Sequence, residues 1–412
     1  METLIQASYL IAAVLFILGL KQMSSPVTAR RGIVWAGAGM VLATLATFLT
    51  PEILASEQSG TNIALIVVAI SLGGGYAWIT AKKVAMTDMP QMIAMYNGMG
   101  GGAAATIAAV ELLKATTEAS HGPSGVAAVA DVLGADVAIL GILGAIIGTI
   151  SFSGSIIAWA KLDGRLSRSK LLPAQHLVNA ALAIATVGFA IAIYFSADIT
   201  TIIVFYSLAL LLGIFITIPV GGADMPVIIS LFNALTGLAV GFEGYVLGNA
   251  AMIIAGIVVG SAGSLLTQLM AKAMNRSVAN VFFAGVGTDA QATTGDGIEG
   301  VMKEIQAQDA GILMSFASQV VIIPGYGMAV AQAQHKIWEL SQLLDEKGVK
   351  VKFAIHPVAG RMPGHMNVLL AEAGVPYDMI YDMDDINADF KNTTVALVIG
   401  ANDVVNPSAK ND

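Results

Sequence analysis

The sequence has no cysteine and few charged residues, and both features narrow the range of functions. Without cysteine there is no disulfide framework, no thiol catalysis and no cysteine-ligated zinc or iron–sulfur centre. Five scattered histidines among 412 residues also argue against a metal site. Charged residues make up only 12% of the chain, whereas an average soluble domain has about 25%. The composition therefore indicates a largely membrane-embedded protein without metal chemistry.

The charge divides the chain into two parts. Residues 1–276 carry 12 basic and 12 acidic side chains, whereas residues 277–412 carry 8 and 16. The whole formal net charge of −8 therefore lies in the second part. An acidic domain binds nucleic acid poorly, because nucleic-acid phosphates attract Lys and Arg. We predict a membrane part, in contact with the lipid bilayer, followed by an acidic soluble domain with no nucleic-acid partner.

Nine apolar runs approach the length of roughly 20 residues that a helix needs to cross a bilayer. The first run is not a signal peptide, since it lacks a positive n-region and a good cleavage site. We therefore predict an α-helical polytopic membrane domain of about nine spans. The predicted spans are 4–20, 32–50, 61–80, 89–113, 134–160, 175–196, 200–219, 225–242 and 247–271.

The basic residues predict how these spans are oriented. Eleven of the twelve Lys and Arg residues in 1–276 fall in alternate loops, and only Lys114 falls on the other side. Loops rich in Lys and Arg remain on the cytoplasmic side. The N-terminus is then outside and residues 277–412 are cytoplasmic, as an odd number of spans requires.

Residues beyond 277 alternate between apolar strand patterns and helix patterns, which favours a Rossmann-like α/β domain with a parallel, doubly wound sheet. We predict a membrane domain at 1–274, a linker with the first helix of the soluble domain at 275–319, and a nucleotide-binding domain at 320–412. The predicted strands are 320–323, 351–355, 378–381 and 395–399, and the predicted helices are 298–310, 328–347 and 367–373.

A glycine turn follows the first of these strands, in the segment Gly325, Tyr326, Gly327, Met328, Ala329 and Val330. This is the pattern of a dinucleotide-binding fingerprint, with Val330 in place of the third glycine. The glycines permit a tight turn and let backbone N–H groups approach a pyrophosphate. The alternative is a plain strand–helix turn. The second strand ends at Ile355 and His356 without the acidic residue that binds a ribose hydroxyl, which favours NADP over NAD, or another binding mode.

Two later loops are further candidates for binding the cofactor. The first loop carries a single arginine among glycines. It either closes over phosphates or is a solvated loop. The second loop lies at the carboxyl end of a strand, where ligands bind in such sheets, and the alternative is an ordinary turn. Their residues are Val358, Ala359, Gly360, Arg361, Met362 and Pro363 in the first loop, and Gly400, Ala401, Asn402 and Asp403 in the second.

Polar residues within the spans are candidates for a path through the membrane, because lipid offers no hydrogen-bond partner. Asn97 and Asn233 lie in such positions and either relay a proton or form packing bonds between glycine-rich helices. Asp224 caps the eighth span at the cytoplasmic face or is a simple N-cap. For Glu111 and Glu243, near the outer face, we expect solvated helix ends.

Six segments of the chain resemble the beta subunit of proton-translocating NAD(P) transhydrogenase, and the likeness extends over essentially the whole length. These segments are 81–90, 221–226, 273–277, 324–334, 356–361 and 400–403. The resemblance implies that the C-terminal domain binds NADP(H), in an orientation reversed from ordinary Rossmann enzymes. A partner alpha subunit, or subunits, would bind NAD(H) and supply membrane helices that complete the bundle.

The resemblance also implies a mechanism and an assembly. Hydride would pass directly between the two nicotinamides, coupled to proton translocation, in a dimer of protomers in the bacterial inner (plasma) membrane. No residue would be catalytic, because the cofactors carry the chemistry. Arg361 and Asp403 would sense the redox state of NADP(H). Asp224 and Arg276 would pass it to the region of Asn97 and Asn233.

Two departures from the family pattern matter. Some relatives have histidine at the position of Asn97, so here we expect the ionisable relay group on a partner chain. Relatives also continue beyond the position of Asp412 with further strands and a Lys-Arg-Ser segment that clamps the 2′-phosphate. We therefore expect either a C-terminally truncated chain or impaired NADP binding. The alternative function is a nucleotide-regulated channel or secondary transporter without catalysis. Such a protein would need a filter-like repeat or paired broken helices, and the sequence shows no internal repeat of this kind.

Overall fold

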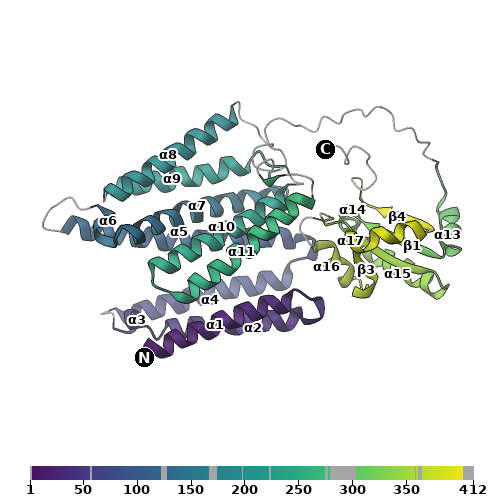
Figure 1. Cartoon of the computed structure of the whole chain (residues 1–412), viewed down its shortest axis with the longest axis horizontal. Coiled ribbons are helices and arrows are strands. Elements are labelled where there is room, and N and C mark those ends of the chain that lie inside the picture. Colours follow the sequence, from purple (N-terminus) through teal and green to yellow (C-terminus); the bar gives the residue numbers. More distant parts are fainter. Residues whose placement is uncertain are drawn as a thin grey trace. The chain divides into compact units, whose positions relative to one another are not determined.

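The computed structural model describes residues 2–55, 58–121, 128–166, 174–196, 198–221, 224–273, 277–278, 303–357, 359–360 and 364–401. The chain divides into two compact units (Figure 1). The helical unit comprises Met1–Val84, Gln91–Val220 and Ile228–Leu266. The sheet unit comprises Ala85–Pro90, Gly221–Val227 and Thr267–Asp412.

Nine long helices form where the nine apolar runs were predicted, among the residues that the structure describes. Seven of them are long and apolar enough to cross a membrane. The arginines of α2 and the glycine run of α5 lower the mean hydropathy of the other two. The nine are α1 Glu2–Met23, α2 Pro26–Thr47, α4 Ser59–Lys83, α5 Met89–His121, α7 Ala135–Leu162, α8 Gln175–Phe195, α9 Ile199–Thr217, α10 Met225–Val246 and α11 Ala250–Ala273, joined by the short α3 Pro51–Leu54, η1 Met86–Asp88 and α6 Val129–Leu133.

Helix α7 is the centre of the helical unit, because small residues let three neighbours approach its backbone. A Cβ at Gly148 would lie 2.8 Å from the carbonyl oxygen of Gly101 in α5. A Cβ at Gly213 in α9 would lie 2.6 Å from the carbonyl oxygen of Ile150. On the α10 side, Ser151 donates to the carbonyl oxygen of Phe232 at 2.8 Å. Close packing of this kind is typical of membrane helices with small residues at their contacts.

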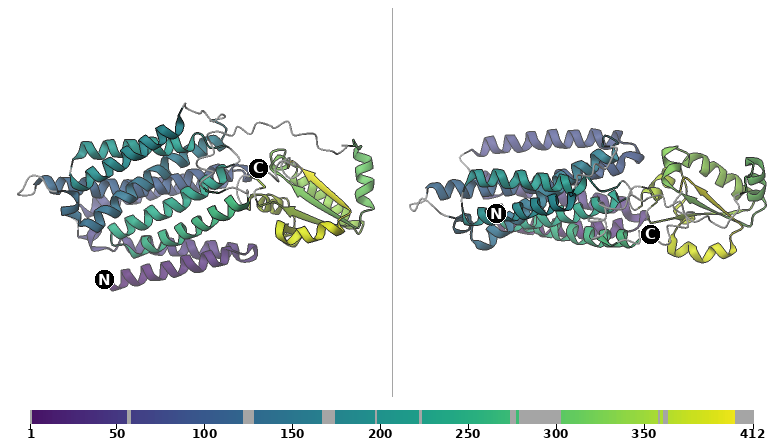
Figure 2. Two further views of the ribbon diagram at one scale, coloured as in Figure 1. Left: turned by 45° about the horizontal axis from the view of Figure 1, so that its top comes forward. Right: turned by 90° about the horizontal axis from the view of Figure 1, so that it is seen from above.

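Helices α10 and α11 also meet backbone to backbone. A Cβ at Gly237 would lie 2.5 Å from the amide nitrogen of Gly260, and one at Gly244 would lie 2.7 Å from that of Ile253. Helix α4 is the opposite case, since none of its residues is buried. The ribbon views show these helices as long, nearly parallel rods (Figure 2).

Two contacts show which helix ends lie together. Lys161, in the last turn of α7, donates to the carbonyl oxygens of Thr217 at 3.3 Å, Ile218, and Val220 at 2.7 Å. These carbonyls lie at and just beyond the end of α9, where carbonyl groups have no partner within the helix. At the other end of α7, Asp136 accepts a hydrogen bond of 2.7 Å from the Tyr245 hydroxyl of α10. The ends therefore alternate as the basic loops predict, while the orientation in the membrane stays a prediction.

The sheet unit contains a four-stranded parallel sheet in the order β3-β2-β1-β4. The predicted parallel α/β architecture is therefore confirmed. The strands are β1 Gln319–Pro324, β2 Lys350–Ile355, β3 Ile380–Asp382 and β4 Val395–Ile399. The helices are α13 Ala307–Ser315, α14 Tyr326–Val330, α15 Gln334–Glu346, α16 His365–Glu372 and α17 Met383–Ile386, with η2 Tyr377–Met379 and η3 Asn387–Asn392.

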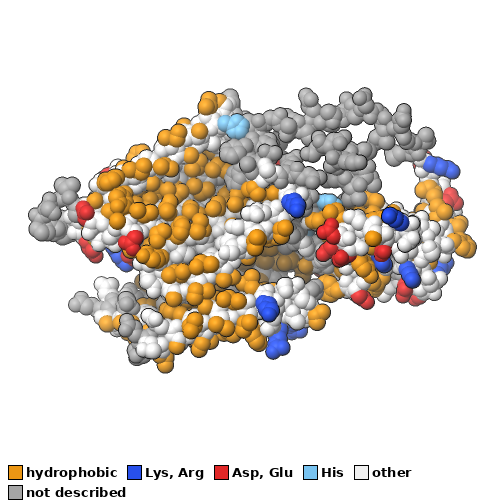
Figure 3. Space-filling model, in the orientation of Figure 1, with side chains coloured by type: hydrophobic (Ala, Val, Ile, Leu, Met, Phe, Trp, Pro, Cys, Tyr) orange, Lys and Arg blue, Asp and Glu red, His pale blue; other side chains and the backbone are white. Residues whose placement is uncertain are grey.

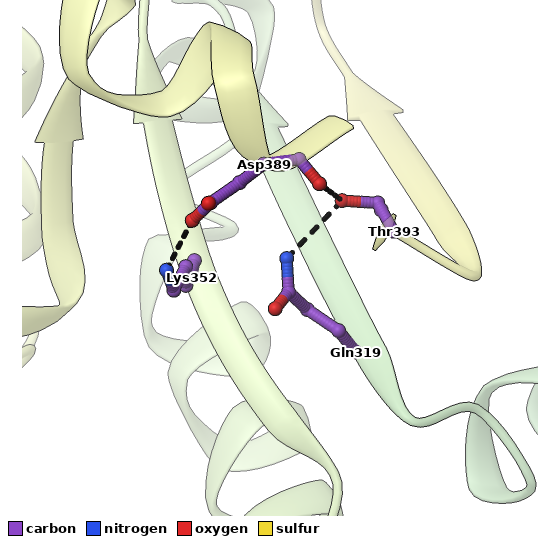
Figure 4. A network of polar contacts seen from close by, with 4 residues as sticks. All are labelled: Gln319, Lys352, Asp389 and Thr393. Atoms are coloured by element: carbon purple, nitrogen blue, oxygen red, sulfur yellow. Dashed lines mark hydrogen bonds and ion pairs between the residues drawn. The ribbon is translucent and has the colours of Figure 1, made fainter. Parts of the chain in front are cut away.

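Both faces of the sheet are covered, because side chains alternate along a strand. Val320 and Ile322 of β1 pack into the main core with residues of α14, α15 and α16. Val321 and Ile323 point to the other face, where Ile386 of α17 covers them. Polar contacts also join the inner strands β1 and β2 to η3 (Figure 4). Lys352 pairs with Asp389, whose carbonyl accepts from Thr393, and Thr393 accepts from Gln319.

The helix predicted over 328–347 is divided in two. Helix α14 ends at Val330 and α15 begins at Gln334. Between them Gln332 has a φ of 51°, in the left-handed region. The amide of Gln332 donates to the carbonyl of Ala329, and the amide of Ala333 to that of Met328. This pair of bonds is a Schellman motif, which usually has glycine at the left-handed position.

Candidate functional site

The strand order places a topological switch point between β1 and β4. The chain runs outward from β1 to β2 to β3 and then returns to the other side of β1 as β4. Open α/β sheets bind ligands at the carboxyl ends of the strands on either side of such a point. The loop after β1 holds Gly325, and the loop after β4 holds Gly400. The two glycine motifs predicted from the sequence therefore lie side by side.

These two loops pack against each other through backbone. Gly325 donates from its amide to the carbonyl of Ile399 at 2.7 Å, and Gly327 to that of Gly400 at 3.0 Å. A Cβ at Gly325 would overlap the Gly400 carbonyl oxygen. Gly400 itself has a φ of 65° and contacts the amide of Met328 so closely that a Cβ would overlap it. Glycine is therefore required at both ends of the contact.

The observed hydrogen bonds give the glycines a different role from the one that the sequence predicts. The sequence predicts that their amides face a pyrophosphate, whereas here the amides of Gly325 and Gly327 bond to β4 and its loop. Helix α14 has only five residues, and its Met328 and Ala329 are buried in the core, whereas Val330 is exposed. Contact between the two loops is thus sufficient to explain the turn, and its residues remain candidates by position.

The loop after β2 folds back on α16. Gly360 has a φ of 100°, and a Cβ there would lie 2.8 Å from Nδ1 of His365. His365 is fully buried, with Nε2 3.2 Å from the carbonyl oxygen of Met86, which belongs to the same unit. Its ring centroid lies 6.2 Å from that of Tyr326. Sequence reasoning missed His365, although its place after a glycine loop was a usable signal.

Several predicted site residues lie outside the described part of the chain. They are Val358, Arg361, Met362, Pro363, Asn402, Asp403 and Arg276. Ala359, Gly360, Gly400 and Ala401 are described, and all are partly buried or exposed at the carboxyl edge of the sheet. Among the described residues, no group of His, Asp and Glu is arranged to hold a metal ion.

In the helical unit, the structure connects Asn97 to α7. Its Nδ2 donates to Oγ of Ser155 at 3.0 Å, while its Oδ1 is buried without a partner. Asn233 of α10 is half-buried and is not the residue that Asn97 bonds. Asp224 directly precedes α10, and its carbonyl accepts from the amide of Val227 at 3.1 Å. Asn97 and Asn233 therefore lie on different helices of the helical unit, whereas Asp224 belongs to the sheet unit. Ser155 is a residue that the sequence did not single out.

Glu243 corrects a prediction. We expected a solvated helix end, but its exposed fraction is 0% and both carboxyl oxygens are buried without a hydrogen-bond partner. Gly144 of α7 makes the space, since a Cβ there would overlap Oε1 of Glu243. Glu111 is different, because it forms a 2.6 Å ion pair with the exposed Lys114. The glycine on the facing helix was the signal that the sequence offered.

Comparison with known proteins covers nearly the whole chain with one family. The sequence model of the family described as NAD(P) transhydrogenase beta subunit matches residues 5–412. Two curated relatives named NAD(P) transhydrogenase subunit beta, one from Rhodospirillum rubrum and one from a strain of that species, are each 43% identical over 417 residues. Each alignment covers 100% of this chain and 86% of the relative.

Proposed function

The chain belongs to the NAD(P) transhydrogenase beta-subunit family, and on this basis we propose that it is the NADP(H)-binding, proton-conducting subunit of that enzyme. The family name places it among oxidoreductases that use nicotinamide nucleotides, and the apolar helices make it a membrane protein. Its partner would be an alpha subunit that binds NAD(H). The observation that carries the proposal is the switch point between β1 and β4, which has a glycine loop on each side.

The switch point supports a dinucleotide site by its position in the sheet. Gly325 and Gly400 let the two loops pack against each other, so a ligand would lie over the carboxyl edge that they form and not between them. Because the amides of Gly325 and Gly327 are occupied, charge for the phosphates would come from Arg361 in the loop after β2, which suits phosphate geometry. The bound nicotinamide supplies the hydride chemistry, and the protein supplies binding and orientation.

We place the domain boundaries as the sequence predicts them, with the membrane domain at 1–274, the linker and first helix at 275–319, and the NADP(H)-binding domain at 320–412. The N-terminus would be outside and the nucleotide domain cytoplasmic, in the bacterial inner membrane. In this arrangement Arg361 and Asp403 sense the redox state of the cofactor. Asp224 and Arg276 would pass the signal to Asn97 and Asn233.

Coupling requires that NADP⁺ and NADPH bind two states of the protein with different affinities. A nucleotide bound equally well in both states would shift nothing, however tightly it bound. The polar atoms inside the helical unit are the groups that the two states would present differently to water. The Oδ1 atom of Asn97 is one of them, since it is buried and has no partner.

The proposal is tested with the assembled enzyme, meaning this chain with its alpha subunit, in proteoliposomes that contain a pH-sensitive dye. Addition of NADPH and an NAD analogue should produce hydride transfer together with a change of internal pH. A protonophore should abolish the pH change and accelerate hydride transfer. Ion movement that responds to nucleotide without any hydride transfer would contradict the proposal and favour the channel or transporter.

A further inference from the structure

A carboxylic acid lies unpaired inside the helical unit. Glu243 is on α10, three residues before the helix ends at Val246, yet its exposed fraction is 0%. Both of its oxygens are buried and have no hydrogen-bond partner. An isolated carboxylate in an apolar interior is very unfavourable, so such a group is either protonated or paired. Within a membrane span, an ionisable residue of this kind is rare and marks an ion or proton pathway.

Among the residues that the structure describes, no cationic side chain is paired with Glu243. On α5, Lys114 is engaged with Glu111 at 2.6 Å. On α9, the Tyr206 hydroxyl donates to the Ala105 carbonyl at 2.9 Å. On α7 and α10, Asp136 and Tyr245 bond to each other. The described neighbours therefore leave the Glu243 carboxyl group without a cationic or hydrogen-bonding partner.

A stripe of small residues on α7 leads from Glu243 toward Asn97. Gly144, Gly148, Ser151 and Ser155 follow at intervals of four, three and four residues, so they share one face of the helix. Gly144 faces the Glu243 carboxyl group, and Ser155 accepts from Asn97. The stripe spans about 16 Å at 1.5 Å per residue.

Hydroxyl groups occupy the middle of this stripe. Oγ of Ser151 bonds to the Phe232 carbonyl at 2.8 Å and lies 2.5 Å from Oγ1 of Thr236. A hydroxyl group can both donate and accept a hydrogen bond. Transfer of a proton along a row of polar groups requires both abilities. The stripe therefore has an unpaired acid at one end, hydroxyls in the middle and an unpaired amide oxygen, Oδ1 of Asn97, at the other.

We propose that Glu243 is a binding site for the translocated proton, at one end of a polar file along α7 that ends at Asn97. This rests on the proposed function, since it assumes that the enzyme moves protons. The proton is taken up by one carboxylate oxygen, forming an O–H bond, and is released when that bond breaks. The ionisable group that we expected only on a partner chain is then present in this chain.

The test compares Glu243→Gln with Glu111→Gln in the assembled enzyme in proteoliposomes. Both variants remove one carboxyl group from the same end of the unit, but only Glu243 is buried. We expect Glu243→Gln to slow proton movement and coupled hydride transfer by roughly 100-fold, as removal of an acid/base group does. NADPH binding should be unchanged, and Glu111→Gln should behave as wild type.

The outcomes separate this proposal from the function on which it rests. If the wild type transfers hydride without moving protons, the proposed function is wrong. If the wild type moves protons and Glu243→Gln moves them at the same rate and ratio, the Glu243 site is wrong and the function stands. If a loss of activity reflects misfolding, thermal unfolding in detergent will show it.

An infrared experiment covers the case of a variant that does not assemble. In the wild type, the carbonyl band of a protonated carboxylic acid should change when NADPH replaces NADP⁺. Glu243→Asp retains a carboxyl group in a different position, so the band should shift in frequency and proton movement should be partly retained. An identical band in the wild type and in Glu243→Asp would overturn the assignment.

Discussion

Helices α4 and α7 are both long, apolar and rich in glycine, yet no residue of α4 is buried whereas α7 has buried residues along its whole length. The difference lies in what each glycine meets. In α4, nothing lies within 4 Å of a Cβ at Gly73, Gly74 or Gly75. In α7, a Cβ at Gly148 would press on the backbone of α5. Composition thus identifies a membrane helix, while its neighbours decide whether it lies inside.

The polar residues follow the same division. Ser151 and Ser155 of α7 bond to other helices, whereas Ser71 of α4 is exposed. In the space-filling view, apolar side chains cover the visible surface of the long helices, whereas acidic and basic side chains are mixed over the sheet unit (Figure 3). Exposed apolar surface of this kind is suited to lipid or to helices of a partner.

The largest expected effect concerns the coupling of proton movement to hydride transfer. It compares a residue of α5 that bonds to α7 with a residue of exposed α4. Asn97→Leu removes the amide that bonds Ser155 of α7, so the ratio of protons moved to hydride transferred should fall to near zero. Binding of NADPH to the sheet unit should remain normal, because Asn97 lies in the helical unit. The matched control is Asn62→Leu on α4, which should keep the ratio. Measurement is by pH-sensitive dye in proteoliposomes, and an unchanged ratio in Asn97→Leu would assign Asn97 to helix packing.

A second comparison adds one methyl group to a glycine of each helix. Gly148→Ala should lower the free energy of unfolding by about 1–3 kcal/mol, because the facing Gly101 backbone cannot move aside. Gly74→Ala should raise it by up to about 1 kcal/mol through helix propensity. Thermal unfolding of both variants in the same detergent checks the signs. A stabilising Gly148→Ala would show that α5 and α7 are not in backbone contact.

A third comparison removes one hydroxyl group from each helix. Ser151→Ala should lower stability by about 1 kcal/mol, since it leaves the Phe232 carbonyl and the Thr236 hydroxyl with fewer partners. Ser71→Ala, on exposed α4, should have an effect too small to measure. Equal unfolding temperatures for the two variants would show that the interior bonds do not contribute to stability.

The smallest expected effect is in the sheet unit. It extends the comparison of buried and exposed positions to a partly exposed ion pair, Lys352 and Asp389. Asp389 raises the pKa of Lys352 above its ordinary value of 10.5 through their hydrogen bond. A raised pKa means that the pair stabilises the fold below pH 10.5 and loses this contribution as pH rises through the raised value. Lys352→Met should therefore cost at most about 1 kcal/mol at neutral pH. The difference from wild type, measured by urea unfolding, should vanish at strongly alkaline pH.

The long helices and the strands could be predicted because their signals are local. The run 134–160 became Ala135–Leu162, and the strand 395–399 is reproduced residue for residue. The break at Gln332 could not be predicted, because a left-handed residue there is usually glycine. The burial of Glu243 was missed for a different reason. It depends on Gly144, which is 99 residues away in the sequence and on another helix.

The backbone contact between α10 and α11 has a mechanical consequence. With Gly237 against Gly260 and Gly244 against Ile253, there is no flexible side-chain layer between the two helices to absorb sliding. We expect the two helices to move together. From Met225 to Glu243, α10 extends about 27 Å at 1.5 Å per residue. Because the two helices meet through backbone at these points, we expect a displacement of α10 along its axis to carry α11 with it.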